Sequence, residues 1–234
     1  MSIGFNEFTE FIKKRIVDQG IGFGVTVTSQ SERVDYLKHV KPEDLIKFGF
    51  ETEFVGRLPV ISVFEELTED DLYAILRNPN NPVMVSKKLD FKAYDIWVNF
   101  EDRALRALAH LAYEEQTEAR GLVSAMEKVL LKLEKKLPST EIKKLPVTEE
   151  VVKDPEGMLQ EIISTPDDPR WTQLYEKVVH DEKESVKEYL RNNQAVLAAI
   201  SKIGLTPSRI DLIADVYAMS AWSINGAMSK IGTY

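Results

Sequence analysis

The residue best placed to do chemistry is Arg57, which lies in the segment Gly56-Arg57-Leu58-Pro59. Proline lacks a backbone N–H and disfavours helix at the preceding residue, and glycine tolerates backbone angles that other residues avoid. The pattern therefore predicts a bend that leaves Arg57 at the end of an ordered segment. A guanidinium carries a permanent charge and donates two parallel hydrogen bonds, so it would suit a phosphate group there. A surface arginine in an ordinary turn would show the same spacing.

A second arginine, Arg120, is expected in the first turn of a long amphipathic helix that carries Leu122, Met126, Val129 and Leu133 on one side. From this position the side chain would face whatever packs against the start of the helix. It could contact an anion, or it could be an ordinary exposed arginine.

A third candidate is the apolar loop Ile21-Gly22-Phe23, which is flanked by Gly20 and Gly24. Glycines make a segment mobile, and exposed apolar groups are unfavourable in a loop. The loop could therefore insert into a pocket on another protein, with Ile21 and Phe23 as anchors. Alternatively, Phe23 folds back onto its own core.

Several catalytic motifs are missing from the sequence. No glycine is followed by lysine, so the chain has no Gly-x-x-x-x-Gly-Lys-[Ser/Thr] loop to hold phosphates and organise Mg²⁺. The apolar segment 60–64 is followed by Glu65-Glu66, which only imitates the Asp-Glu of a Walker B box. The chain has no cysteine, and its three histidines are far apart in the sequence, so no metal site is predicted.

The composition is that of a soluble globular protein, with 44% hydrophobic and 29% charged residues among 234. A net charge of −8 argues against a general nucleic-acid binder. The N-terminal residues do not resemble a secretory signal, and no apolar run approaches the roughly 18 residues of a membrane span. We therefore expect a cytoplasmic protein that engages neither nucleic acid nor membrane.

Periodicity predicts a mainly helical α/β fold. Pro42 and Thr68 are expected to begin helices, and Gly49 and Asn78-Pro79 to end them. The other expected helices lie near residues 5–20, 101–113, 119–137, 171–190, 195–203 and 207–221, with a further helix expected near 80–92. The expected strands are 25–28, 60–64, 96–100 and a strand-like run over 145–151.

Four segments together resemble ClpX-type AAA+ protein unfoldases. Residues 54–60, Phe-Val-Gly-Arg-Leu-Pro-Val, are similar to the arginine-finger segment of that family, and residues 117–122 to its sensor-2 motif. Residues 20–24 and 42–49 match further upstream motifs. The resemblance runs from about residue 5 to about residue 152, is weakest over residues 80–92, and does not extend beyond about residue 155.

The resemblance implies three parts: the end of an AAA+ large domain (1–66), an AAA+ small lid domain (67–155) and an appended helical bundle of unknown role (156–234). It implies that Arg57 is a catalytic finger and that Arg120 contacts nucleotide. It also implies that Ile21, Gly22 and Phe23 dock on a ClpP-type peptidase. Two positions depart from the family pattern: Glu118 replaces a usual glycine, and Val123 a frequent arginine.

The implied function is that of the C-terminal part of an ATP-dependent unfoldase. Such a part would work in a hexameric ring of AAA+ subunits that passes unfolded or tagged proteins to the peptidase. ATP and Mg²⁺ would require a phosphate-binding loop supplied elsewhere, so no hydrolysis is expected from this chain alone. The chain could be a fragment, half of a split gene or a degenerate paralogue. The alternative is a non-hydrolysing adaptor that docks on a Clp peptidase or unfoldase ring.

Overall fold

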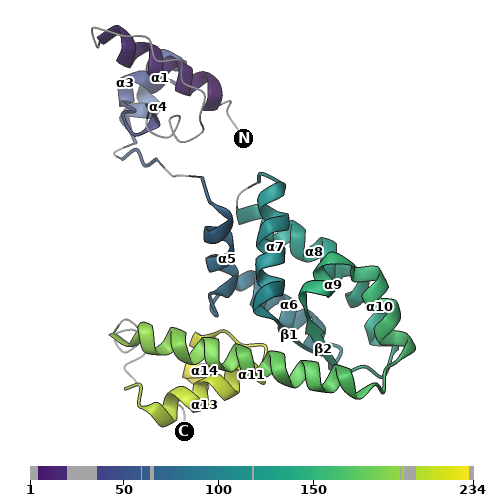
Figure 1. Cartoon of the computed structure of the whole chain (residues 1–234). Helices are drawn as coiled ribbons and strands as arrows, with labels where there is room; N and C mark the ends of the chain where they lie inside the picture. The colour runs from purple at the N-terminus through teal and green to yellow at the C-terminus, as the bar shows by residue number, and fades with distance from the viewer. Residues whose placement is uncertain are drawn as a thin grey trace. The chain divides into compact units, whose positions relative to one another are not determined.

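The computed structural model describes residues 5–19, 36–58, 60–63, 66–117, 119–195, 197 and 204–231. The chain divides into two compact units, residues 1–66 and residues 67–234 (Figure 1). The described residues are mainly helical, with one small parallel sheet of two strands. No helix in this part of the chain is long and apolar enough to cross a membrane.

A small apolar core lies between the helices of the first unit. Those that the structure describes are α1 (Phe5–Gln19), α3 (Pro42–Phe48) and α4 (Thr52–Gly56). Phe8 and Ile12 of α1 are buried, and the Phe8 ring meets the edge of the Phe48 ring at a centroid distance of 4.9 Å. An ion pair of 2.7 Å between Arg15 Nε and Asp44 Oδ1 also joins α1 to α3.

Several predicted helix boundaries are confirmed. Helix α3 begins at Pro42 and is followed by Gly49 in the left-handed conformation, with φ of 119°. Helix α5 (Glu69–Arg77) begins with the expected capping box: the Asp71 amide donates to Thr68 Oγ1, and the Thr68 amide donates to Asp71 Oδ2. The acidic first turn of α5 also suits the helix dipole.

The predicted strand over residues 60–64 is wrong. Residues 60–63 form no strand, and the Val60 side chain is 73% exposed. A strand is stabilised by pairing with a neighbour, and the only sheet among the described residues is the pair β1–β2 in the second unit. The predicted strand 25–28 lies outside the described residues, as does most of the predicted helix 195–203.

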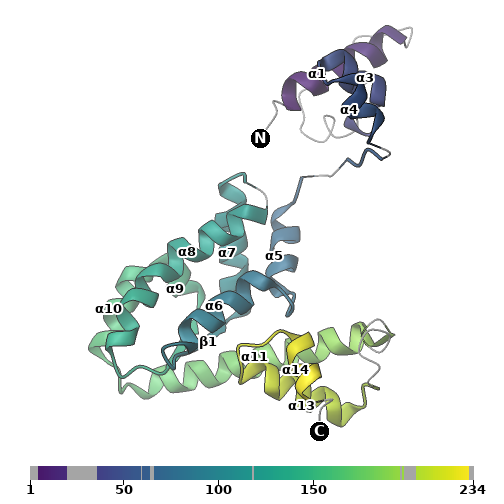
Figure 2. The ribbon, with the colours of Figure 1, turned by 180° about the vertical axis from the view of Figure 1, so that it is seen from behind.

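The second unit is a helical assembly around the two-stranded sheet (Figures 1 and 2). After α5 come α6 (Pro82–Lys92), β1 (Trp97–Phe100), α7 (Asp102–Glu114), α8 (Ala119–Lys136), η1 (Leu137–Ser139), β2 (Lys144–Val147), α9 (Glu149–Lys153), α10 (Pro155–Ser164), α11 (Pro169–Asn192), α13 (Pro207–Ala218) and α14 (Ile224–Ile231). Strands β1 and β2 are parallel, with Val98 opposite Leu145. A parallel pair needs a long crossover, and here α7 and α8 supply it.

The strand-like run over residues 145–151 is only partly confirmed. Strand β2 ends at Val147, opposite Phe100, the last residue of β1. The Glu101 amide still donates to the Val147 carbonyl at 2.9 Å, and the chain then turns into α9. The strand therefore ends where its partner ends, and Thr148 caps α9 before the apolar residues resume at Val151.

Two buried clusters stabilise the second unit. The first gathers residues from Leu72 to Trp171 and includes Leu159 and Ile162 of α10. The second gathers residues from Val186 to Met228. Helix α11 contributes to both. We refer to residues 67–164 as the central region and to residues 169–231 as the C-terminal arm.

Candidate functional site

Arg57 lies immediately after α4, as its C-terminal capping residue. Val55 is buried and fixes the short helix, whereas Phe54 and Leu58 on either side are exposed. The Arg57 guanidinium donates from Nη2 to Glu53 Oε1 at 2.9 Å, and the two side chains are 78% and 82% exposed. Such an exposed ion pair contributes little to stability and is easily broken. The guanidinium is therefore presented at the surface, where an anion could replace Glu53.

The predicted role of Gly56 in the bend is wrong. Gly56 ends α4 without a left-handed φ, and a Cβ added to it would meet nothing within 4 Å. Neither the backbone angle nor the available space requires glycine at this position. The turn after α4 is made instead by ordinary backbone hydrogen bonds, in which the amides of Arg57 and Leu58 donate to the carbonyls of Phe54 and Val55. Pro59 lies outside the described residues.

Arg120 is the second residue of α8, which confirms its predicted place in the first turn, and its side chain is exposed. No described residue forms an ion pair with it; Glu118 lies outside the described residues. A cation in the first turn of a helix is disfavoured by the helix dipole, so Arg120 does not serve to stabilise α8. Its charge and the helix N-terminus together make this end of α8 favourable for an anion.

Gly121 fixes the position of this turn. A Cβ added to Gly121 would lie 2.6 Å from the Ala112 carbonyl oxygen and 3.1 Å from Thr117 Oγ1. Real Cβ atoms do not approach a backbone oxygen so closely, so α8 approaches the end of α7 more tightly than any side chain would allow. The backbone at Arg120 is thus held against α7 by its neighbour.

The predicted site residues belong to different parts of the chain. Arg57 lies in the first unit and Arg120 in the second. The loop Ile21-Gly22-Phe23 lies outside the described residues. The two arginines could contact phosphate, but neither provides a ligand for Mg²⁺.

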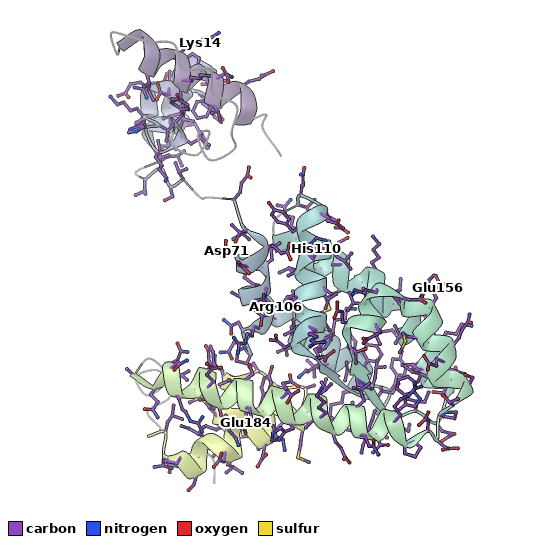
Figure 3. The ribbon with its side chains drawn as sticks, in the orientation of Figure 1. Lys14, Asp71, Arg106, His110, Glu156 and Glu184 are labelled. Atoms are coloured by element: carbon purple, nitrogen blue, oxygen red, sulfur yellow. The ribbon has the colours of Figure 1, made fainter. Side chains whose placement is uncertain are left out.

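The sequence did not reveal the polar contacts that Arg106 and His110 of α7, both labelled in Figure 3, make with α5. The Arg106 guanidinium lies 3.9 Å from the centre of the Tyr73 ring, and His110 Nδ1 lies 3.0 Å from Glu69 Oε2. The hydrogen bond to Glu69 raises the pKa of His110 above its ordinary value. These contacts join α7 to α5. Because the α5 partners are about 30 to 40 residues away in the sequence, no local motif predicts these contacts.

Comparison with known proteins supports the resemblance to ClpX. No family model matches the chain. The chain is 36% identical over 124 residues to the ATP-dependent Clp protease ATP-binding subunit ClpX of Treponema denticola, which covers 52% of this chain and 30% of the relative. It is 41% identical over 142 residues to ClpX of Borrelia duttonii and of Borrelia recurrentis, which covers 60% of this chain and 33% of each relative.

This chain therefore spans about a third of the length of the ClpX subunits that it matches. The match includes more than half of the residues of this chain, at an identity well above what chance would give. The predicted resemblance to ClpX-type ATP-binding subunits is confirmed over that part of the chain.

Proposed function

We propose that this chain contributes the assembly and sensing parts of a ClpX-type machine that uses ATP to unfold proteins for a ClpP-type peptidase. The observation that carries the proposal is the similarity to ClpX subunits over 52–60% of the chain. Two exposed arginines, Arg57 and Arg120, support it because each stands at a helix end with its guanidinium accessible.

In this proposal Arg57 acts across a subunit boundary of a hexameric ring. An arginine finger stabilises the charge that develops on the transferred phosphate, and it can reach a neighbouring subunit only from an exposed position. Arg57 meets this condition, because its one described partner is the equally exposed Glu53. Arg120 contacts nucleotide from the central region, which acts as the lid, and links lid movement to nucleotide state.

ATP and Mg²⁺ fit this chain only in part. The guanidinium groups suit the outer oxygens of a phosphate. These 234 residues contain no glycine followed by lysine, so the loop that would cradle the phosphates and position Mg²⁺ must be supplied from outside them. ATP supplies the energy for unfolding when it is bound there. The protein substrates would be unfolded or tagged chains, and Ile21, Gly22 and Phe23 would dock on the peptidase.

A second candidate function is that of a non-hydrolysing adaptor, which is consistent with the lack of a phosphate-binding loop within these 234 residues. An adaptor would occupy the peptidase or cap an unfoldase ring through the loop Ile21-Gly22-Phe23. It would need neither arginine for its action.

The test is to mix the chain with a ClpX fragment that carries the phosphate-binding loop and lacks the C-terminal third. The first proposal is supported if the mixture hydrolyses ATP and if Arg57→Ala or Arg120→Ala in this chain abolishes that hydrolysis. Lys47→Ala is the matched control, because Lys47 is another exposed cation of the first unit. Binding to a peptidase ring without any restored hydrolysis would favour the adaptor.

A further inference from the structure

A small cluster of buried polar groups lies where α6, β1, α11 and α13 meet. Lys88 Nζ forms an ion pair of 2.5 Å with Glu182 Oε1, and the two side chains are 5% and 13% exposed. Asn99 donates a hydrogen bond to the other oxygen of Glu182, and its amide nitrogen lies 3.3 Å from the Ala218 carbonyl oxygen. The Lys88 ammonium also lies 4.8 Å from the centre of the Tyr217 ring.

This cluster joins two parts of the chain that are remote in sequence. Lys88 and Asn99 belong to the central region, whereas Glu182, Tyr217 and Ala218 belong to the C-terminal arm. A buried charge is costly unless it is paired and its remaining hydrogen-bonding capacity is satisfied. Both oxygens of Glu182 have partners from the central region, so the charges of Lys88 and Glu182 are paired in the buried interface only while the arm is in place.

Two further polar contacts fix the arm. Arg77 Nη2 lies 3.2 Å from Glu188 Oε2, and Arg77 Nε donates to Ser185 Oγ at 3.3 Å. Because Glu182, Ser185 and Glu188 are three residues apart, they follow one side of α11. At the other end of the arm, the backbone N–H of Asn225 donates to Asn80 Oδ1 at 3.2 Å. Contacts at α11, α13 and α14 leave the arm little freedom to rotate.

Apolar packing accompanies these contacts. Helix α11 lies beside both strands of the sheet, α13 packs against α11, and α14 packs against α13 (Figures 1 and 2). Trp171 of α11 belongs to the core of the central region, whereas Val186 and Leu190 belong to the core of the arm. A single continuous helix therefore carries residues of both cores, and it provides a stiff connection between them.

We propose that residues 77–99 form an intramolecular docking surface for the C-terminal arm, with Glu182 as its anchor. The arm is then a fixed cover over one side of the β1–β2 sheet, and it moves with the central region as one body. That side of the sheet is closed to other proteins in any assembly that the chain enters. This proposal concerns the second unit alone and does not depend on ATP, on a ring or on a peptidase.

The test is a double-mutant cycle in the full chain with Lys88→Met, Glu182→Leu and both together, followed by thermal unfolding. Glu182→Leu leaves a buried lysine unpaired, and we expect the unfolding temperature to fall by on the order of 10 °C. The double variant replaces the ion pair with apolar groups of similar size and should recover most of that loss. Asp181→Asn is the matched control, because it removes an exposed acid one residue away and should change the unfolding temperature little.

Amide hydrogen exchange supplies a second measurement that is independent of overall stability. In the wild-type chain, α13 should be protected as strongly as β1, because the arm and the central region open together. In Glu182→Leu, exchange in α13 should accelerate more than exchange in α8. The proposal would be overturned if Glu182→Leu unfolded at the same temperature as Asp181→Asn, or if wild-type α13 exchanged much faster than β1.

Discussion

A Cβ atom added to Gly121 would lie 2.6 Å from the carbonyl oxygen of Ala112. This close approach between α8 and α7 fixes the helix turn that carries Arg120. A side chain at Gly121 would push the two helices apart, and it would displace the arginine together with the turn. The position of a candidate functional residue thus depends on the size of its neighbour.

Gly121→Ala should therefore destabilise the second unit by about 1–3 kcal/mol, which is the usual cost of overpacking. Gly56→Ala is the matched control beside the other arginine, because its added methyl group would meet nothing within 4 Å. It should be neutral, or stabilising by about 0.5–1 kcal/mol through higher helix propensity. Chemical denaturation followed by circular dichroism measures both. Equal losses for the two variants would show that Gly121 has no special packing role.

Local patterns predicted the helix boundaries because their causes are local. Thr68 and Asp71 are three residues apart and cap one helix, and Gly49 needs only its own backbone freedom to end another. Periodicity likewise identified α13 from its buried residues. The strand over residues 60–64 failed for the opposite reason, since apolar residues make a strand only where a neighbouring strand is available.

The contacts between elements could not be predicted, because nothing in the sequence near Lys88 indicates Glu182, 94 residues away. The same holds for the approach of Gly121 to Ala112 and for the pairing of His110 with Glu69. At the candidate site, the sequence correctly placed Arg57 after an ordered segment and Arg120 in the first turn of a helix. It misjudged Gly56, since a glycine before a turn need not adopt the angles that only glycine can.

The stability of the second unit should depend on the protonation of His110. The hydrogen bond from His110 to Glu69 raises the folded-state pKa of the imidazole above its ordinary value. The resulting stabilisation is fully present below the unfolded-state pKa, near 6.5, and is lost as the pH rises through the raised folded-state value.

A titration of the imidazole signals by NMR measures this pKa directly. Glu69→Gln should return the His110 pKa towards its ordinary value, because the acceptor loses its charge. Asp70→Asn is the control at the adjacent position and should leave the His110 titration nearly unchanged. If Glu69→Gln left the pKa of His110 as it is, the contact between α5 and α7 would not form in solution.

Lys87 should contribute much more to stability than a typical surface lysine. Its Nζ lies 2.7 Å from Glu127 and 2.9 Å from Glu134 of α8, and its side chain is only 9% exposed. Burial lowers the pKa of Lys87, but the hydrogen bonds to the two glutamates outweigh it, so the net shift is upward. The ammonium therefore remains charged, and its stabilising contribution is lost only in strongly alkaline solution.

Lys87→Met should reduce the free energy of unfolding by about 3 kcal/mol or more, since it removes two hydrogen bonds between charged groups, each worth about 1.5–3 kcal/mol, and leaves Glu127 and Glu134 without their cation. Lys132→Met is the control, because Lys132 pairs with Glu156 on the surface and both are more than half exposed. Its effect should be small. If Lys87→Met had an equally small effect, the ion pairs of Lys87 would not contribute to the packing of α6 on α8.

If Ile21 and Phe23 dock on a peptidase, Phe23→Ala should weaken that association without unfolding the chain. Burial of one such side chain is worth roughly 1.5–3 kcal/mol, so a single loop binds weakly. Several loops in a ring act together and can raise avidity by roughly 10²–10⁴-fold. Phe23→Ala should therefore reduce affinity far more for the assembled ring than for the single chain. Surface plasmon resonance with an immobilised ClpP-type ring measures both affinities.

Leu212→Ala is the control for that measurement, because Leu212 is an apolar residue that is 48% exposed on α13. Its substitution should not change peptidase binding. If Phe23→Ala unfolded the chain and left the residual binding unchanged, Phe23 would be a core residue and the docking role would be excluded.

The proposed role of Arg57 predicts a specific kinetic defect in a reconstituted ring. Arg57→Ala should lower kcat by roughly 10³-fold or more while leaving nucleotide affinity nearly intact, since a finger stabilises charge that develops in the transition state. Arg57→Lys should restore little of the lost kcat, because an ammonium lacks the planar fork that donates two parallel hydrogen bonds.

Glu53→Gln tests the ion-pair partner of Arg57. It removes the acid that holds the guanidinium at 2.9 Å, and kcat should remain at or above the wild-type value if a phosphate replaces that acid during turnover. If a ring that carries Arg57→Ala kept the wild-type kcat, Arg57 would be an ordinary surface arginine without a catalytic role.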